Sequence, residues 1–314
     1  MAILPPDPVF CFKGDMGHIH SLCFPAKFDN YCSQILAATE KGTVYFWDLE
    51  TNRLQYKQQM GESIQAVHHF DDNIITQEKS GLVKLWSTKK SAYNIVHTYQ
   101  AGGGFCKSIV LNSSLIVPQQ GGVIDVLDIN TLSKARQLVP DKDDLGMLMC
   151  LTEVEIAGNP YLLGGYETGD VILWDLNAGK ASGHIKLQEQ LTSITFDPVM
   201  NRAVCSAASS NVLQLFCIDK SLNMTLKAEL SITNEGCNVV KMRPDRRLFV
   251  SGGLDGRLRV FSCKTLRILV VLAQHKGPVT DVQFSPGVIN YWNSKIMAAS
   301  GADGSITLWN IYNN

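Results

Sequence analysis

Short segments in which apolar and polar residues alternate recur along all 314 residues of the chain. In the last of them, Ile296 to Ile311, the sequence IMAASGADGSITLWNI contains two such segments joined by an Asp-Gly pair. Alternation over two residues predicts β-strands, and Asp-Gly between them predicts a tight hairpin. No long stretch repeats its apolar residues at the helical spacing of about 3.6. The pattern therefore predicts an all-β protein.

The same hairpin outline occurs seven times, and each copy ends in a large apolar anchor. The anchors are Trp47, Trp86, Leu127, Trp174, Phe216, Phe261 and Trp309. Successive anchors lie 39 to 48 residues apart, close to the roughly 40–45 residues that build one four-stranded propeller blade. A strand-like segment precedes every hairpin, and another follows each of the first six. We therefore predict one seven-bladed β-propeller domain over residues 1–314.

The seventh copy lacks a fourth strand, because only five residues follow Trp309. An unpaired strand edge is prone to pair with other chains, so native sheets cover it. Residues 8–14, PVFCFKG, are the one strand-like segment left without a blade. We predict that this segment completes blade seven and closes the ring.

Composition narrows the classes of function. The net charge is −1, from 28 basic and 29 acidic residues, which disfavours binding to nucleic acid or anionic membranes through bulk charge. The apolar runs are strand-sized, and the first residues do not resemble a secretory signal. Nine cysteines without a C-x-x-C pair predict free thiols in a reducing compartment, the cytoplasm or nucleus. The adjacent residues His68 and His69 point to opposite faces of a strand, so they cannot easily bind the same metal ion. We therefore expect neither a metal nor a cofactor.

The hairpins that end in Trp-Asp resemble WD40 repeats over nearly the whole chain. This resemblance implies a buried hydrogen-bond network in blade seven: Asp303 accepts from His275, His275 contacts Ser300, and Ser300 contacts the indole of Trp309. The same residue types build hydrolase triads, but the structural interpretation is favoured and we expect no catalytic residues. In blade one, His18 is expected to be the histidine of the corresponding network. We expect blades that have only part of this network to depend more on apolar contacts.

Two long connectors carry aromatic residues that are candidates for partner contacts. They join the first and second strands of blades one and seven, and they contain Phe28, Tyr31, Tyr291 and Trp292. Blades one and seven are neighbours in a closed ring, so these side chains are expected to gather at one seam. Aromatic clusters of this kind are typical of interface hot spots. The alternative, that they fold back over their own blades, remains open.

Two charged segments are further candidates for partner contacts. A turn in blade six has the basic residues Arg243, Arg246 and Arg247. Guanidinium groups pair well with carboxylates or phosphates, so this turn is a candidate dock for an acidic peptide. The connector between blades three and four, on the opposite face, has the acidic residues Asp141, Asp143 and Asp144. It is a candidate contact for a basic partner. A solvated loop is the alternative for both.

Several segments together resemble the family of the guanine nucleotide-binding protein subunit beta-like protein 1 and the fungal ASTRA-associated protein 1. They are residues 5–8, 145–151, 165–175, 243–246, 254–261 and 272–275. The resemblance implies a non-catalytic adaptor of the triple-T co-chaperone and ASTRA assemblies, which support phosphatidylinositol-3-kinase-related kinases and DNA-damage signalling.

Because the first strand is expected near residue 8, no heptad segment is predicted to coil with a gamma subunit. We expect a monomer outside its complex that contacts protein partners rather than nucleic acid or membrane. The alternative function is a chromatin-associated reader of a modified or acidic peptide. Such a reader would cage a methylated lysine with aromatic residues at the central channel.

Overall fold

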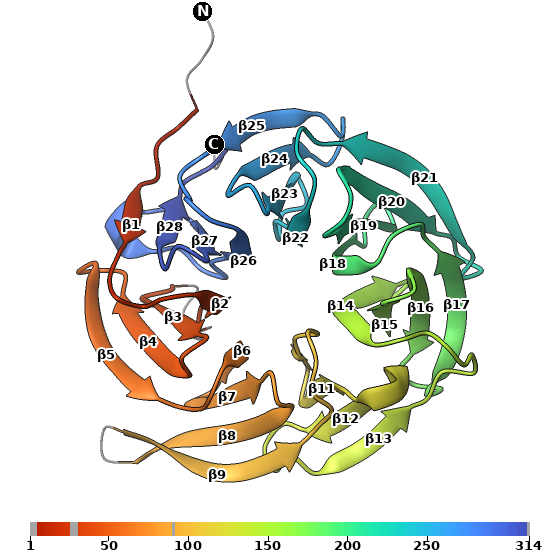
Figure 1. Cartoon of the computed structure of the whole chain (residues 1–314), viewed down its shortest axis with the longest axis horizontal. Helices are drawn as coiled ribbons and strands as arrows, with labels where there is room; N and C mark the ends of the chain where they lie inside the picture. The colour runs from red at the N-terminus through yellow and green to blue at the C-terminus, as the bar shows by residue number, and fades with distance from the viewer. Residues whose placement is uncertain (1–4, 26–30, 90–91, 313–314) are drawn as a thin grey trace, which may run out of the picture.

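The computed structural model describes residues 5–25, 31–89 and 92–312. Within these residues, seven four-stranded antiparallel sheets stand around a central channel, as Figure 1 shows. Helical structure in this part of the chain is limited to two short 3-10 turns. The prediction of an all-β, seven-bladed propeller is confirmed.

Each blade is a meander whose first strand lines the channel and whose fourth strand lies at the rim. Blades one to four contain β2 (Ile19–Cys23), β3 (Gln34–Thr39), β4 (Thr43–Asp48), β5 (Arg53–Gln59); β6 (Ile64–Phe70), β7 (Asn73–Glu78), β8 (Leu82–Lys89), β9 (Ala92–Gln100); β10 (Ile109–Leu111), β11 (Ser114–Pro118), β12 (Ile124–Asp128), β13 (Lys134–Leu138); and β14 (Leu148–Ile156), β15 (Asn159–Tyr166), β16 (Asp170–Asp175), β17 (Lys180–Lys186). Blades five to seven contain β18 (Leu191–Asp197), β19 (Arg202–Ala207), β20 (Val212–Ile218), β21 (Met224–Ser231); β22 (Cys237–Met242), β23 (Leu248–Gly253), β24 (Leu258–Ser262), β25 (Ile268–Leu272); and β26 (Val279–Phe284), β27 (Met297–Gly301), β28 (Ile306–Trp309), β1 (Phe10–Phe12). The 3-10 turns are η1 (Gln120–Gly122) and η2 (Asn290–Trp292).

The ring closes through the first strand of the chain. β1 pairs antiparallel with β28, and Phe10, Cys11 and Phe12 lie opposite Leu308, Thr307 and Ile306. Figure 1 shows this red strand beside the blue strands of blade seven. The predicted closure of the propeller by its N-terminal strand is therefore confirmed.

The core lies between neighbouring blades rather than inside any one sheet. The middle strands are almost entirely buried, as in β19, β23 and β27. The fourth strands alternate between half-buried and exposed positions, as in β5 and β21. Each sheet is covered on both faces by its neighbours, so water is reached mainly by the rim strands and, along the channel, by the first strands. This is why the middle strands are mainly apolar and most rim strands contain several polar residues, with the apolar β25 as an exception.

The polar network of blade seven is linked by a different hydroxyl from the predicted one. His275 reaches Asp303 through Nδ1 at 3.3 Å and the hydroxyl of Thr307 through Nε2 at 3.0 Å. The indole N–H of Trp309 donates to the same Thr307 hydroxyl at 2.8 Å. The prediction that Ser300 links the histidine to the indole is therefore wrong.

The register of the β27–β28 hairpin explains this correction. Ser300 lies opposite Ile306, whereas Thr307 and Trp309 lie opposite Ala299 and Met297. Opposed residues share a face of the sheet and adjacent residues point to opposite faces, so Ser300 faces away from the indole. Its hydroxyl instead lies 3.0 Å from that of Thr280.

Two other blades have ion pairs that involve buried side chains, in addition to the apolar contacts that were expected to hold them. In blade six, the buried Arg259 pairs with Asp255 at 2.7 Å. In blade two, Lys84 pairs with the buried Glu78 at 2.6 Å. Burial of a carboxylate requires such a partner, because an unpaired buried charge is strongly destabilising.

Blade four has a buried carboxylate with three ion-pair partners. The buried carboxylate of Asp170 accepts hydrogen bonds from Lys142, Thr168, His184 and Lys186 at 2.6–2.8 Å. Burial alone would raise the pKa of Asp170, but the four donors outweigh it and hold that pKa well below its ordinary value. Three of the four donors carry or can acquire positive charge, so the site holds the turn and the rim strand of this blade together.

Candidate protein-interaction surfaces

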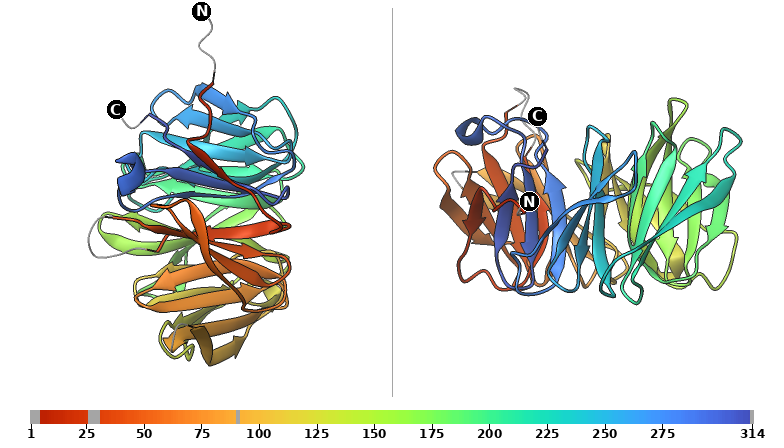
Figure 2. Two further views of the ribbon diagram at one scale, coloured as in Figure 1. Left: turned by 90° about the vertical axis from the view of Figure 1, so that its left-hand side faces the viewer. Right: turned by 90° about the horizontal axis from the view of Figure 1, so that it is seen from above.

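The meander topology divides the loops of the propeller between two faces. All first strands run in the same direction along the channel, so the connectors between first and second strands lie at one face, which we call the hairpin face. The connectors between blades and the turns between second and third strands lie at the other, which we call the connector face. Figure 2 shows both faces edge-on, with the short η2 turn projecting from the hairpin face.

The aromatic connectors of blades one and seven lie side by side on the hairpin face. Tyr31 forms an isolated parallel bridge with Val288, and the backbone N–H of Cys32 donates to the Val288 carbonyl at 2.9 Å. The connectors therefore meet at the junction where the ring closes. Phe28, the fourth aromatic residue of this group, lies outside the described residues.

The three described aromatics of this seam have different exposures. Tyr31 and Tyr291 are 52% and 61% exposed, respectively. Trp292 is half-buried and packs against the core cluster that contains the fully buried Ile289. Its ring meets that of Tyr291 edge-on at 5.1 Å. Trp292 thus anchors η2 to the core, and the two tyrosines are displayed to solvent.

Arg243 has a structural role that contradicts its prediction as a partner contact. Its side chain is buried, and one guanidinium nitrogen donates to the carbonyls of Ile311 and Tyr312 at 2.6 and 3.1 Å. Its Nε and Nη2 atoms form a two-pronged pair with Asp245 at 2.8 and 2.7 Å. The guanidinium fork therefore clamps the segment after β28 onto blade six.

Arg246 and Arg247 extend from the same turn and are exposed on the hairpin face. The hairpin of blade five on this face also exposes Val199 and Met200, which sequence reasoning did not single out. The sequence around them, Asp-Pro-Val-Met-Asn, predicts a turn and gives no sign of a contact surface. The hairpin face thus combines exposed aromatic, aliphatic and cationic side chains.

The acidic residues lie on the connector face, apart from the aromatic seam. Asp141, Asp143 and Asp144 are all exposed. Lys142, between them, is held by its bond to Asp170. The structure therefore places the predicted acidic and aromatic candidates on opposite faces.

The channel forms a cavity of about 720 Å³ with a mixed lining. Lys107 and Asp281 face each other across 3.5 Å within it. Its lining includes Phe24 and Phe284, which end first strands near the hairpin face, and Phe105, which precedes a first strand near the connector face. These three rings lie toward different ends of the channel, so they do not form the aromatic cage of a methyl-lysine reader.

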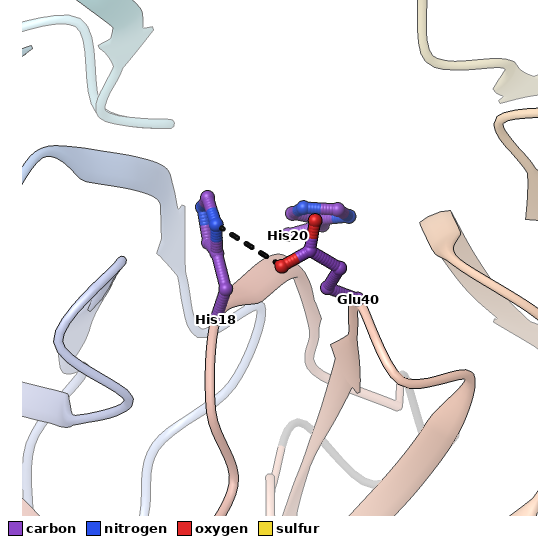
Figure 3. Close-up of side chains that lie close together, drawn as sticks. All are labelled: His18, His20 and Glu40. Atoms are coloured by element: carbon purple, nitrogen blue, oxygen red, sulfur yellow. Dashed lines mark ion pairs between the residues drawn. The ribbon is translucent and has the colours of Figure 1, made fainter.

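A cluster of three side chains on the connector face was missed by sequence reasoning. Potential ligand atoms of His18, His20 and Glu40 all lie within 4.8 Å of one another (Figure 3). Nδ1 of His18 is 3.8 Å from Glu40, and the two imidazole centroids are 4.6 Å apart. Burial, together with the nearby Lys79 and His18, lowers the pKa of His20 to about 4. The available signal was His-x-His, a spacing that places both rings on one side of a strand.

Across the described residues, no helix combines the length and apolar character needed to span a bilayer. All nine cysteines are free thiols.

Comparison with known proteins agrees with the architecture. The family model described as "WD domain, G-beta repeat" matches residues 224–262 and 266–310, which correspond to blades six and seven with the rim strand of blade five. The chain is a seven-bladed β-propeller that contains WD40 repeats. WD40 propellers are typically non-enzymatic scaffolds, and protein interaction is their common role.

This propeller is similar to several named proteins. It is 27% identical to mouse guanine nucleotide-binding protein subunit beta-like protein 1, over 98% of the chain and 97% of that relative. It is 36% identical to ASTRA-associated protein 1 of Schizosaccharomyces pombe over 23% of the chain and 18% of the relative. It is 27% identical to the Aspergillus flavus protein of the same name, over 59% of the chain and 56% of the relative. The matches to these fungal proteins thus cover about half of their length or less.

Proposed function

We propose that this propeller is a non-catalytic adaptor of a triple-T co-chaperone and ASTRA-type assembly, in which it supports the stability of phosphatidylinositol-3-kinase-related kinases and DNA-damage signalling. The similarity to a beta-like protein along 98% of the chain, with partial similarity to ASTRA-associated proteins, supports this proposal. The exposed aromatic seam at the ring junction is the structural observation that carries it.

The seam has the properties of a preformed docking site. Tyr31 and Tyr291 protrude from connectors that are joined by a backbone hydrogen bond and a β-bridge, and Trp292 holds η2 against the core. Ordering loops and side chains on binding costs free energy, so a surface that is already ordered loses less of its contact energy. Tyrosine also buries a large area with few rotatable bonds.

The neighbouring charges indicate the chemistry of the partner. Arg246 and Arg247 are exposed on the same face, in blade six, which adjoins blade seven. A partner segment that presents apolar side chains toward the seam and carboxylates toward these arginines fits the surface. A helical-repeat subunit of the co-chaperone, with acidic residues flanking an apolar ridge, is the proposed occupant.

Affinity purification from cells tests the proposal and the surface together. The intact chain is expected to recover the co-chaperone subunits. The double variant Tyr31→Ala/Tyr291→Ala is expected to lose at least 90% of that recovery. Trp292 is left intact because its ring packs on the core, and its loss would confuse folding with binding.

The matched control is Phe105→Ala, which removes a 65% exposed aromatic side chain near the opposite face. It is expected to recover partners like the unaltered chain. Failure of the unaltered chain to recover co-chaperone subunits would reject the adaptor function. Equal recovery by the double variant would reject the seam as the docking site.

The same proposal places the protein in the cytoplasm and nucleus, as a monomer outside its complex. Imaging of the tagged chain tests this location. Confinement of the signal to a secretory compartment would contradict it.

A further inference from the structure

We propose that His18, His20 and Glu40 form a binding site for a divalent transition-metal ion, best matched by Zn²⁺, on the connector face of blade one. The three side chains come from the segment before β2, from β2 itself, and from the turn between β3 and β4. Figure 3 shows them converging beside the first strand of the blade. Two imidazoles and one carboxylate are a ligand set that zinc uses in proteins.

A hydrogen bond to the next blade sets the tautomer of His20. Its Nδ1 lies 3.0 Å from the carbonyl oxygen of Ile64 in the next blade. A carbonyl only accepts, so Nδ1 carries the hydrogen and Nε2 holds a lone pair. Metal-binding histidines commonly donate their second ring N–H to a carbonyl in this way, which orients the ring.

The propeller architecture enforces that tautomer. In several blades, the second residue of the first strand donates a hydrogen bond to the neighbouring blade. Gln65 donates to the carbonyl of Cys106, and Asn238 donates to that of Val279. His20 occupies the corresponding position in blade one, so its Nδ1–H is committed to the blade contact and its Nε2 is left for a ligand.

His18 and Glu40 are not at the positions of the WD40 hydrogen-bond network. The N–H of Glu40 donates to the His18 carbonyl at 2.9 Å, and in blade seven the N–H of Ala302 donates to the Pro278 carbonyl at the same distance. His18 and Glu40 therefore correspond to Pro278 and Ala302. The identification of His18 as the network histidine of blade one is wrong.

The network positions themselves carry other residues in blade one. His275 and Asp303 of blade seven correspond to Asp15 and Lys41, counted from the same backbone match. Neither residue type reproduces the histidine–aspartate pair. The histidines and glutamate of the cluster thus have no counterpart in the network that holds blade seven together.

The electrostatics are consistent with a neutral pair of ring ligands and one anionic ligand. Metal-binding ligands are deprotonated, as neutral imidazoles and an ionised carboxylate are. Glu40 directs Oε2 toward His18, and its other oxygen lies 3.9 Å from Nζ of Lys79. The Lys79 charge opposes a cation at this site and is expected to moderate its affinity.

Small side-chain movements complete the coordination. Zinc bonds of about 2.0–2.1 Å in a tetrahedron place ligand atoms roughly 3.4 Å apart. One potential ligand atom of each residue already lies within 4.8 Å of the others, and the Glu40 side chain is 53% exposed. It can therefore rotate toward the rings without disturbing the core. The His18 side chain is also 35% exposed, so water has access to the site as a further ligand.

Metal titration of the full-length protein under reducing conditions tests the site. Zn²⁺ is expected to bind at one equivalent by calorimetry, and Co²⁺ is expected to give the visible absorption of a tetrahedral nitrogen–oxygen site that Zn²⁺ removes. His18→Ala, His20→Gln and Glu40→Gln are each expected to weaken Zn²⁺ binding at least tenfold. Glutamine is chosen for position 20 because Gln65 makes the corresponding cross-blade hydrogen bond in blade two.

Two further variants sharpen the test. His97→Gln alters an exposed histidine on the rim strand β9 and is expected to leave the affinity unchanged. Lys79→Met removes the opposing charge and is expected to tighten Zn²⁺ binding several-fold. Thermal melting without metal confirms the folding of each variant. If His20→Gln fails to fold, the other two ligand variants still decide the result.

The proposal is overturned if the unaltered protein binds no Zn²⁺, or if the three ligand variants bind it like the unaltered protein. Thiolate-to-Co²⁺ charge-transfer absorption would also overturn it, because that signal assigns the metal to cysteines.

Discussion

Closure of the ring by β1 predicts that Phe12 is among the most costly residues to truncate. Its side chain is 1% exposed and lies in the core cluster shared by blades one and seven. Its ring centroid is 4.6 Å from that of Trp47 in blade one. Phe12 therefore packs in the core of blade seven and also connects β1 to blade one across the junction.

The magnitude follows from the loss of a fully buried phenyl ring. Phe12→Ala is expected to lower the free energy of unfolding by about 3–5 kcal/mol, because it removes apolar burial and leaves a cavity. For 314 residues, an unfolding entropy of about 2.1 cal/mol/K per residue converts 4 kcal/mol into a melting-temperature drop of roughly 6 °C. Removal of residues 1–12 also deletes the pairing with β28 and is expected to lower it further.

Urea denaturation followed by tryptophan fluorescence measures this change, with thermal melting as a second readout. The matched control is Phe105→Ala, which truncates an exposed phenylalanine and is expected to change stability by less than about 0.5 kcal/mol. Equal stability of the Phe12→Ala and Phe105→Ala variants would refute the argument that β1 closes the ring. A truncation of residues 1–12 with an unchanged melting temperature would refute it as well.

Three further predictions concern the buried polar groups. Arg243→Met is expected to cost about 3 kcal/mol in urea denaturation, since the carbonyls of Ile311 and Tyr312 lose their guanidinium donor and Asp245 loses its two-pronged partner. The exposed Arg247→Ala is the control, and equal effects of the two variants would contradict the clamp. Because the pKa of Asp170 is depressed in the folded state, its contribution to stability is present above the unfolded pKa of about 3.9 and is lost as pH falls below it. Asp170→Asn should therefore lower the unfolding free energy at pH 7 and flatten its decline below pH 4, and an unchanged acid profile would refute this. Burial lowers the pKa of His68, which faces Lys107 and Asp281, to about 4. Below pH 6.5 the unfolded chain therefore binds more protons than the folded protein. The free energy of unfolding should fall by on the order of 2–3 kcal/mol between pH 6.5 and pH 4. His68→Gln should reduce that fall in urea midpoints measured across this range, and a full fall in the variant would contradict the assignment.

The sequence by itself determined the number of blades and the way they close. Strand alternation, tight turns and anchors such as Trp47 and Trp309 are local features, and a repeated local pattern needs no knowledge of distant contacts. Because only the last copy lacked a rim strand, the role of residues 8–14 also followed from counting. The aromatic connectors were found for the same reason, since they are long insertions at equivalent places in neighbouring blades.

Tertiary structure alone decided which polar groups meet. Ser300 and Thr307 are both hydroxyl residues near Trp309, and only the register of their hairpin selects Thr307. The sequence predicts Arg243 to be an exposed turn residue, but in the folded protein the segment that contains Ile311 lies against it. His18, His20 and Glu40 converge because a turn and a channel strand are brought together at one end of a blade. Periodicity specifies the face and order of strands, whereas the partner of a side chain depends on register and on contacts between blades.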